Sequence, residues 1–443
     1  MERKLLAGTW KTNITPPLGI ALPGGFTERR AQEIQDELYS NAIVIDDGNR
    51  EIALVSVDVC VIHNNICKDI YRLIEAGCNI KEENILLAAT HTHNGPKLGD
   101  IFVGVEDTWE EYVENFKKCV ASSVIMARKR KKPVKIGAAF GINDRYVFNR
   151  RLKKPDGSVV MNFAEKEYLQ DCIDSGITDN EVSFFVFEDS FHKPFAFIVN
   201  YANHNNAMGD VPNISPDWAG QISKILSRIY GNEVVTLFLP GACGNINWIN
   251  YKDLSQNFGP ELVEKIGTSI AGTILERICD VEYPEVGRID IMHNKLLIPD
   301  RPFCEYDTKE DNTFGKNEGS RIIFAQYAKE KEIASGKELP VNEVDICVVS
   351  FGKDMAIAAN PAELFVEYGL QIKKNSPFKY TMISELTNGY VGYVCTKHAF
   401  EEGGYEVRKT NNSSHLEIDA GEKIVKASVE LLKTLHNNCQ NAF

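Results

Sequence analysis

The chain repeats one order of elements three times: an apolar strand, an amphipathic helix and a second apolar strand. These units are expected at residues 52–89, 194–239 and 355–383. Strands that alternate with helices favour an α/β architecture, in which helices pack against sheets. Segment 281–299 is typical of an antiparallel strand, so we expect mixed sheets with packed helices. The helices of the three units are expected at 65–75, 216–230 and 361–373.

Length and charge exclude several classes of protein. The chain has 443 residues and a formal net charge of −13, and such an acidic surface repels the phosphates of nucleic acids. No uninterrupted apolar stretch approaches the roughly 18 residues of a spanning helix, so membrane insertion is not expected. No long linker divides the chain, and we expect one domain over residues 1–443.

The cysteines indicate a reducing compartment. The chain has 11 of them, scattered and without a CxxC pair. Secreted scaffolds space their cysteines in even sets, which this pattern does not match. Segment 1–17 also lacks the apolar run of about 7–15 residues that a signal peptide needs. The sequence therefore predicts a cytoplasmic protein.

Two histidines follow the strand expected at 85–89, in the sequence Thr-His-Thr-His-Asn-Gly-Pro at 90–96. Residues two apart on an extended chain face the same way, so His91 and His93 should project together. Two imidazoles on one side suit metal ligation, or ligation combined with proton transfer. The alternative is a pair of surface histidines without a function.

Other polar clusters follow strands or glycines, and each also has a plain structural explanation. A single histidine after a strand, such as His204, is usually a hydrogen-bonded structural residue. Glu363 ends the sequence Asn-Pro-Ala-Glu, which favours a capping box at the start of a helix. Cys243 lies in a glycine-rich turn and would be a nucleophile if a base such as His204 were within reach. The tyrosines at 390, 393 and 405 lie among glycines, where packed rings or available phenols are both expected.

The order of these motifs resembles the catalytic domain of the neutral/alkaline non-lysosomal ceramidase family. The motifs are THTHNGP at 90–96, ISPDWAG at 214–220, FLPGACGNIN at 238–247, NPAELF at 360–365, NGYVGYVCT at 388–396 and EGGYE at 402–406. Members of this family are zinc amidases that hydrolyse the amide of N-acylsphingosine, and the resemblance implies a ceramidase-like fold. Ceramidases continue into an immunoglobulin-like domain, whereas this chain ends soon after the helix expected at 422–436.

The resemblance also implies roles for seven residues. The Zn²⁺ ligands would be His91, His204, Glu363 and Tyr393. His93 would transfer a proton, Tyr405 would help to hold the substrate carbonyl, and Arg150 would bind the substrate. Imidazoles, a carboxylate and a phenol are ligands that suit Zn²⁺, which activates water near neutral pH.

The expected function is a zinc-dependent hydrolase that cleaves a carboxamide. Its substrate would be an N-acyl lipid or a smaller N-acyl compound. Residues 245–247 are Asn-Ile-Asn where ceramidases have a Gly-Asp-Val-Ser-type loop. The resemblance therefore supports the reaction class more strongly than it supports a lipid substrate. Three alternatives stay open: ester, lactone or glycan chemistry at the same metal, a metal-free amidase that uses Cys243, and a non-catalytic ligand-binding protein.

Overall fold

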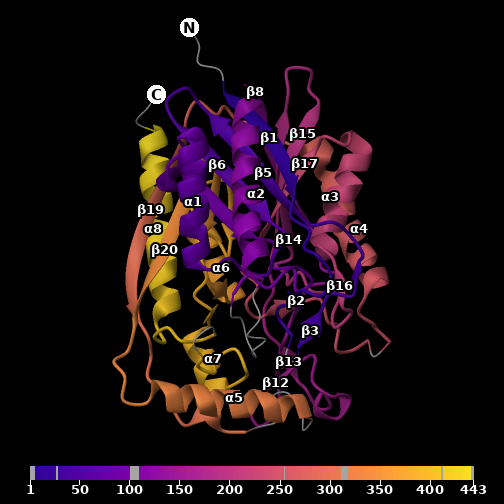
Figure 1. The fold of residues 1–443 in the computed structure, drawn as a ribbon, viewed down its shortest axis with the longest axis vertical. Coiled ribbons are helices and arrows are strands. Elements are labelled where there is room, and N and C mark those ends of the chain that lie inside the picture. The colour runs from indigo at the N-terminus through magenta and orange to yellow at the C-terminus, as the bar shows by residue number, and fades with distance from the viewer. Residues whose placement is uncertain are drawn as a thin grey trace.

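The computed structural model describes residues 5–25, 28–99, 109–253, 255–310, 318–410 and 413–440. Three larger sheets form the centre of the molecule (Figure 1). The first has the strand order β7 (Ile85–Ala89), β6 (Glu51–Val57), β5 (Tyr39–Asp46), β1 (Leu6–Asn13) and β8 (Lys132–Pro133). The second runs β17 (Val235–Pro240), β15 (Pro194–Tyr201), β14 (Glu181–Glu188) and β9 (Lys135–Ile142). The third runs β19 (Ile289–Pro299), β20 (Val341–Phe351), β21 (Met355–Ala359) and β23 (Tyr380–Ser384).

The three sheets share one connectivity. In each, two successive antiparallel pairs lead to a parallel pair whose strands are joined through a helix. The first sheet has one further antiparallel pair, β1 with β8. The joining helices are α1 (Asn64–Cys78), α3 (Asp217–Tyr230) and α6 (Val366–Asn375). A parallel pair needs such a crossover because its strands run in the same direction. The three expected strand–helix–strand units and the mixed α/β sheets are therefore confirmed.

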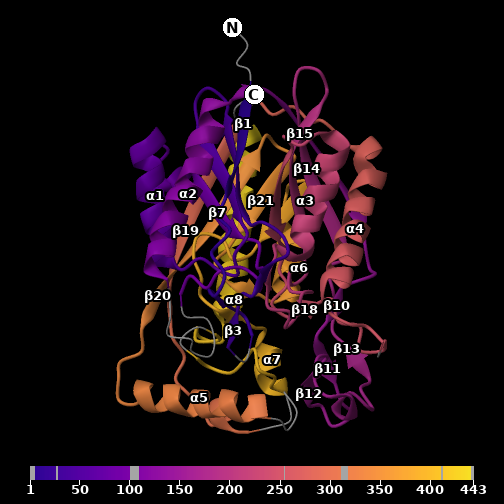
Figure 2. The same cartoon turned by 45° about the vertical axis from the view of Figure 1, so that its right-hand side comes forward.

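The sheets meet in one inner apolar cluster and carry helices on their outer faces. Side chains of all three sheets contribute to this cluster, among them Ile43, Phe185 and Val349. The outer faces are covered by α1 and α2 (Glu110–Lys129), by α3 and α4 (Pro260–Arg277), and by α6 and α8 (Ala420–Gln440). Figure 2 shows strands between the α1–α2 pair and the α3–α4 pair. These helices form because their apolar residues recur every three or four positions and face a sheet.

The remaining elements gather at the carboxyl ends of the parallel strands. Two of these elements are helices, α5 (Glu318–Ala334) and α7 (Lys397–Glu402), which lie at the end opposite the N-terminus in Figure 2. The short strands are β2 (Ala21–Leu22), β3 (Arg29–Arg30), β4 (Glu33–Ile34), β10 (Phe148–Asn149), β11 (Arg151–Lys153), β12 (Val159–Met161), β13 (Asp174–Ser175), β16 (Asn213–Ile214), β18 (Ile246–Asn247), β22 (Glu363–Leu364) and β24 (Tyr393–Val394). Among the described residues, no helix combines the length and the apolar character needed to cross a bilayer.

One predicted helix begins in the wrong place. The expected start at Pro361 is incorrect, because residues 363–364 form strand β22 and α6 begins only at Val366. Strand β22 pairs with β24, where Glu363 lies opposite Tyr393. The Glu363 amide donates to the Gly392 carbonyl at 2.9 Å, so this residue is not the third residue of a helix. The capping explanation of Glu363 therefore fails.

Candidate metal centre

His91 is held in an unusual backbone conformation just beyond β7. Its φ of 64° lies in the left-handed region, which residues other than glycine seldom adopt. The His91 amide donates to the Val59 carbonyl at 3.0 Å, and ring atom Nδ1 lies 2.9 Å from the Cys60 carbonyl. Because a carbonyl only accepts, Nδ1 carries the proton and the lone pair is on Nε2. The expected extended chain at residues 91–93 is thus incorrect, although both imidazoles still reach the same place.

His91, His204 and Glu363 converge, and each lies just beyond a strand of a different one of the three larger sheets. His91 comes after β7, His204 after β15, and Glu363 in β22 after β21. Glu363 Oε2 is 3.6 Å from His91 Nε2 and 3.5 Å from His204 Nε2. Ligand atoms around a tetrahedral Zn²⁺ are roughly 3.4 Å apart, given bond lengths of about 2.0–2.2 Å. The spacing therefore fits a metal ion, and each of the three side chains is at most 3% exposed.

The cluster contains a buried oxygen without a partner. Glu363 Oε2 makes no hydrogen bond within the described residues, whereas Oε1 accepts from Tyr390 at 2.9 Å. A buried carboxylate oxygen is costly unless a cation or a donor satisfies it. Burial lowers the pKa of both His91 and His204, so their imidazoles are neutral and keep a lone pair at neutral pH. This donor set fits a divalent metal.

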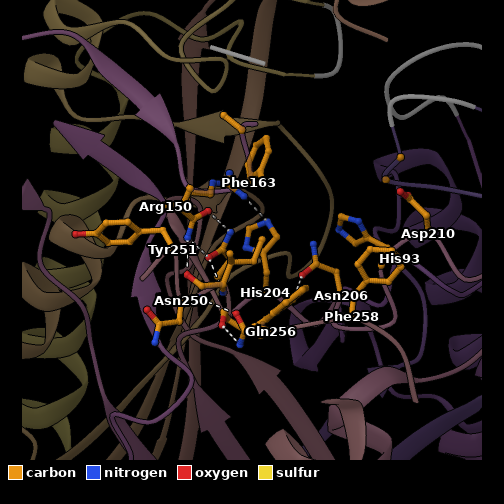
Figure 3. Close-up of a pocket in the computed structure, with 18 of the residues that line it drawn as sticks. His93, Arg150, Phe163, His204, Asn206, Asp210, Asn250, Tyr251, Gln256 and Phe258 are labelled. Carbon is orange, nitrogen blue, oxygen red and sulfur yellow. Dashed lines mark hydrogen bonds between the residues drawn. The ribbon is translucent and has the colours of Figure 1, made fainter. Parts of the chain in front are cut away.

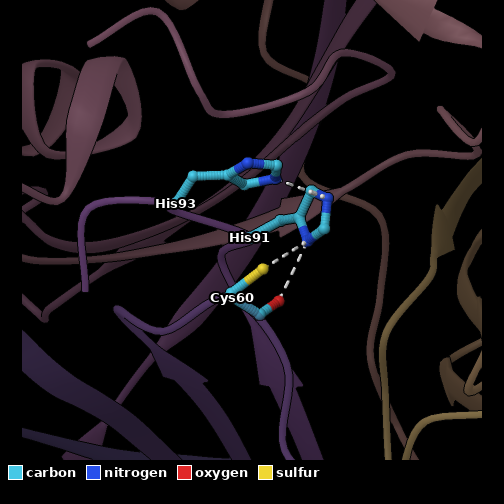
Figure 4. Close-up of side chains that lie close together, drawn as sticks. All are labelled: Cys60, His91 and His93. Atoms are coloured by element: carbon cyan, nitrogen blue, oxygen red, sulfur yellow. Dashed lines mark hydrogen bonds between the residues drawn. The ribbon is translucent and has the colours of Figure 1, made fainter. Parts of the chain in front are cut away.

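His93 lies beside the cluster. Its Nε2 is 3.3 Å from His91 Nε2 (Figure 4). Burial lowers the pKa of His93 well below its usual value. Gly24 packs directly against this ring, and a Cβ atom at Gly24 would overlap it. The Arg29 guanidinium donates to the His93 carbonyl at 2.9 Å, which fixes the backbone.

Arg150 is buried on the other side of His204. Its Nη1 is 3.2 Å from His204 Nε2, and its Nη2 donates to the Gly244 carbonyl at 2.5 Å. Its Nε donates to Glu406 at 3.0 Å, in an ion pair that is almost completely buried. Glu406 therefore orients the guanidinium towards the cluster, a role that no local sequence pattern predicts.

The two predicted tyrosines lie together next to Arg150. The hydroxyls of Tyr393 and Tyr405 are 3.2 Å apart. The Arg150 guanidinium carbon lies 5.4 Å from the ring centroid of Tyr393 and 4.9 Å from that of Tyr405. Burial raises the pKa of both phenols. The structure thus brings all seven predicted residues together, while their roles stay predictions.

Tyr390 and Cys60 belong to this site but were missed. The Tyr390 hydroxyl contacts Glu363, and Cys60 Sγ lies 3.7 Å from His91 Nδ1 (Figure 4). Cys60, His91 and His93 form a second close group of potential ligand atoms. Burial raises the pKa of the Cys60 thiol, which disfavours the thiolate that binds metals.

Cys243 has no base. Its thiol donates to Glu385 Oε1 at 2.9 Å, and its amide donates to Glu385 Oε2 at 3.0 Å. Burial and the Glu385 carboxylate both raise the pKa of this thiol. No described imidazole makes a hydrogen bond to this thiol, so the expected pairing of Cys243 with His204 is not found among the described residues.

A cavity of about 480 Å³ opens onto the cluster (Figure 3). His93, Arg150, His204, Tyr393 and Tyr405 all line it. Its other walls carry aromatic rings next to amide and charged side chains. The aromatic and polar wall residues include Phe163, Trp248, Tyr251, Phe258, Asn206, Asn250, Gln256, Lys166, Asp210 and Asp253. The reactive groups are therefore accessible to a small molecule.

Comparisons with known proteins identify the same fold. The structure is similar to neutral ceramidase from Pseudomonas aeruginosa, with a TM-score of 0.75 and 18% identity over 99% of this chain and 75% of that one. It is also similar to a ceramidase complexed with C2, with a TM-score of 0.73 and 17% identity over 98% of this chain and 76% of that one. At these identities the likeness establishes the ceramidase-like fold.

The sequence itself matches a family profile. Residues 6–268, more than half of the chain, match the profile described as neutral/alkaline non-lysosomal ceramidase, N-terminal. That range contains His91, His93, Arg150 and His204, and the ceramidase-like fold extends over the remaining residues. The chain belongs to the neutral/alkaline non-lysosomal ceramidase family.

Proposed function

We propose that this chain is a zinc-dependent hydrolase that cleaves a carboxamide. The observation that carries the proposal is the buried, unpartnered Glu363 Oε2, which faces the Nε2 atoms of His91 and His204. These three residues would hold the metal, with Tyr393 as the fourth ligand. When bound, Zn²⁺ supplies a Lewis acid and lowers the pKa of water towards roughly 7.

The remaining residues would bind the amide and move the proton. His93 lies beside the proposed ligands, with its Nε2 3.3 Å from His91 Nε2, and would accept a proton there and pass it to the leaving amine. Arg150 and Tyr405 lie together at the cavity wall and would donate to the carbonyl oxygen as it becomes negative. The buried Glu406 holds Arg150 in that direction before the substrate arrives.

The cavity walls support a compact N-acyl compound as the substrate. Aromatic rings alternate there with amides and charges, whereas a long acyl chain is best buried by continuous aliphatic surface. Trp248 is held by a hydrogen bond from its Nε1 to Asn206 Oδ1 at 2.8 Å, which fixes a ring at the wall. The N-acyl lipid is the alternative, supported by the family membership and by the relative complexed with C2. The cytoplasmic location stays a prediction.

The test combines metal analysis with a substrate series. We expect about one zinc per chain in the parent, almost none in Glu363→Ala, and parent-like zinc in Glu261→Ala, a control at an exposed glutamate. A chelator should abolish hydrolysis and added zinc should restore it. N-acetyl amides should be cleaved faster than N-palmitoyl amides of the same amine.

Three results would change the assignment. Cleavage of esters, lactones or glycans but not of amides would change the proposed reaction class and leave the proposed metal site in place. Full activity of the metal-free protein would show that the mechanism does not require a metal. Metal binding without hydrolysis of any of these compounds would favour a ligand-binding protein.

A further inference from the structure

The carboxylate of Glu363 is oriented by Tyr390. The Tyr390 hydroxyl donates to Glu363 Oε1 at 2.9 Å, and both side chains are buried. Oε1 is therefore occupied, while Oε2 faces His91 and His204. Groups that hydrogen-bond to a ligand fix its orientation and tune how strongly it binds a metal.

The position of Tyr390 is itself set by the start of helix α1. The Tyr390 amide donates to Asn64 Oδ1 at 3.0 Å. The neighbouring Gly389 has a φ of 147°, and a Cβ atom there would overlap the Asn64 side chain. The Tyr390 ring also meets the His63 ring edge-on, with centroids 5.7 Å apart. These contacts leave the tyrosine hydroxyl little freedom to turn away from Glu363.

Loop 388–390 is also hydrogen-bonded to β7, the strand that precedes His91. The Asn388 amide donates to the Leu87 carbonyl at 2.8 Å, and Asn388 Oδ1 accepts from the Leu87 amide at 2.9 Å. Oδ1 also accepts from the Tyr71 hydroxyl at 3.0 Å. Leu87 lies in β7, four residues before His91. Loop 388–390 therefore fixes Glu363 and His91 relative to each other, although they belong to different sheets.

We propose that Tyr390 is a positioning residue of the metal centre, which holds Glu363 so that Oε2 alone is presented to the metal. The inference rests on the metal site proposed above. Without the Tyr390 hydroxyl, the carboxylate is free to rotate and must be ordered when the metal binds, which weakens binding. Tyr393, in the same loop, contacts Tyr405 through its hydroxyl and also interacts with Glu363, next to which it is the proposed fourth metal ligand.

The experiment compares Tyr390→Phe with Tyr71→Phe. Each variant removes one buried hydroxyl. The Tyr390 hydroxyl contacts Glu363, whereas the Tyr71 hydroxyl contacts Asn388 in the same loop. Zinc is removed with a chelator, and the zinc affinity of each protein is measured by competition with a chromogenic chelator. We expect Tyr390→Phe to bind zinc about 10–100-fold more weakly than the parent. Tyr71→Phe should bind zinc as the parent does.

A second measurement separates metal binding from folding. The rise in Tm on adding zinc is recorded for each protein against its own zinc-free form, because a ligand stabilises according to its affinity. The rise should be smaller for Tyr390→Phe than for Tyr71→Phe. Equal zinc affinities, or an equal loss in both variants, would overturn the role of Tyr390. A parent that binds no zinc would instead overturn the proposed metal-dependent function.

Discussion

Gly24 determines how closely the chain lies against His93. Its φ of 77° and the adjacent imidazole leave no room for a side chain. Gly24→Ala should displace His93 and lower kcat by about 10²-fold, a typical cost for moving a catalytic group by 1 Å. The zinc content should not change, because His91, His204 and Glu363 do not contact Gly24. Steady-state kinetics together with metal analysis check this outcome.

Gly19→Ala is the matched control for that substitution. Gly19 also has a left-handed backbone, with a φ of 88°, but a Cβ atom there would meet only Trp109 at 3.8 Å. Both variants lose stability because alanine disfavours a positive φ. If the two lose activity equally, the effect comes from the strained backbone and not from His93.

At the scale of elements, the strand–helix–strand units are predictable because local patterns encode them. Apolar runs bounded by Gly, Pro and polar residues mark β15 and β21 with the bounds that the structure has. The start of α6 is not predictable in this way. It depends on the pairing of β22 with β24, which joins residues about 30 positions apart. A local capping pattern cannot reveal such a partner.

The candidate site is also predictable only in part: local patterns indicate where it lies, whereas contacts between distant residues determine its geometry. The polar residues after strands predict where the site lies, because parallel strands end at one edge of the fold. The left-handed turn at His91 depends on the carbonyls of Val59 and Cys60, about 30 residues earlier. Likewise, spacing does not distinguish Tyr390 from Tyr393, since contacts with the distant residues Asn64 and His63 place the Tyr390 hydroxyl at Glu363.

The pairing of β19 with β20 contains a titratable contact. His293 Nδ1 lies 2.9 Å from Asp345 Oδ2. Burial lowers the pKa of His293, but its interactions with Cys347 and Asp345, including the hydrogen bond to Asp345, outweigh burial and raise the pKa to about 11. The stability from this contact is therefore complete below pH 6.5 and is lost as the pH rises through the folded-state pKa.

His293→Gln should accordingly destabilise the protein more at pH 6 than at pH 10. Denaturant unfolding at both pH values measures the two differences in the free energy of unfolding. Adding Asp345→Asn to His293→Gln should cause no further change in how the free energy of unfolding depends on pH. A His293→Gln effect that grows with pH would contradict the assignment of a charged imidazole.

At the scale of the whole molecule, the candidate ligands join the three sheets. His91 follows a strand of the first sheet, His204 a strand of the second, and Glu363 a strand of the third. The equivalent position in the first sheet, after β6, is taken by Cys60, whose carbonyl orients His91. A metal at this point therefore contacts all three sheets at their carboxyl ends.

Removing the metal should consequently destabilise the entire fold rather than one loop. A ligand present at one hundred times its Kd adds about 2.7 kcal/mol to the free energy of unfolding. We expect a chelator to lower Tm in a single transition, and zinc to restore it in proportion to the logarithm of its concentration. His91→Ala should abolish the zinc-dependent shift, whereas Glu261→Ala should retain it. A chelator that lowers activity but leaves Tm unchanged would show that the three sheets are held together without the metal, through the inner apolar cluster alone.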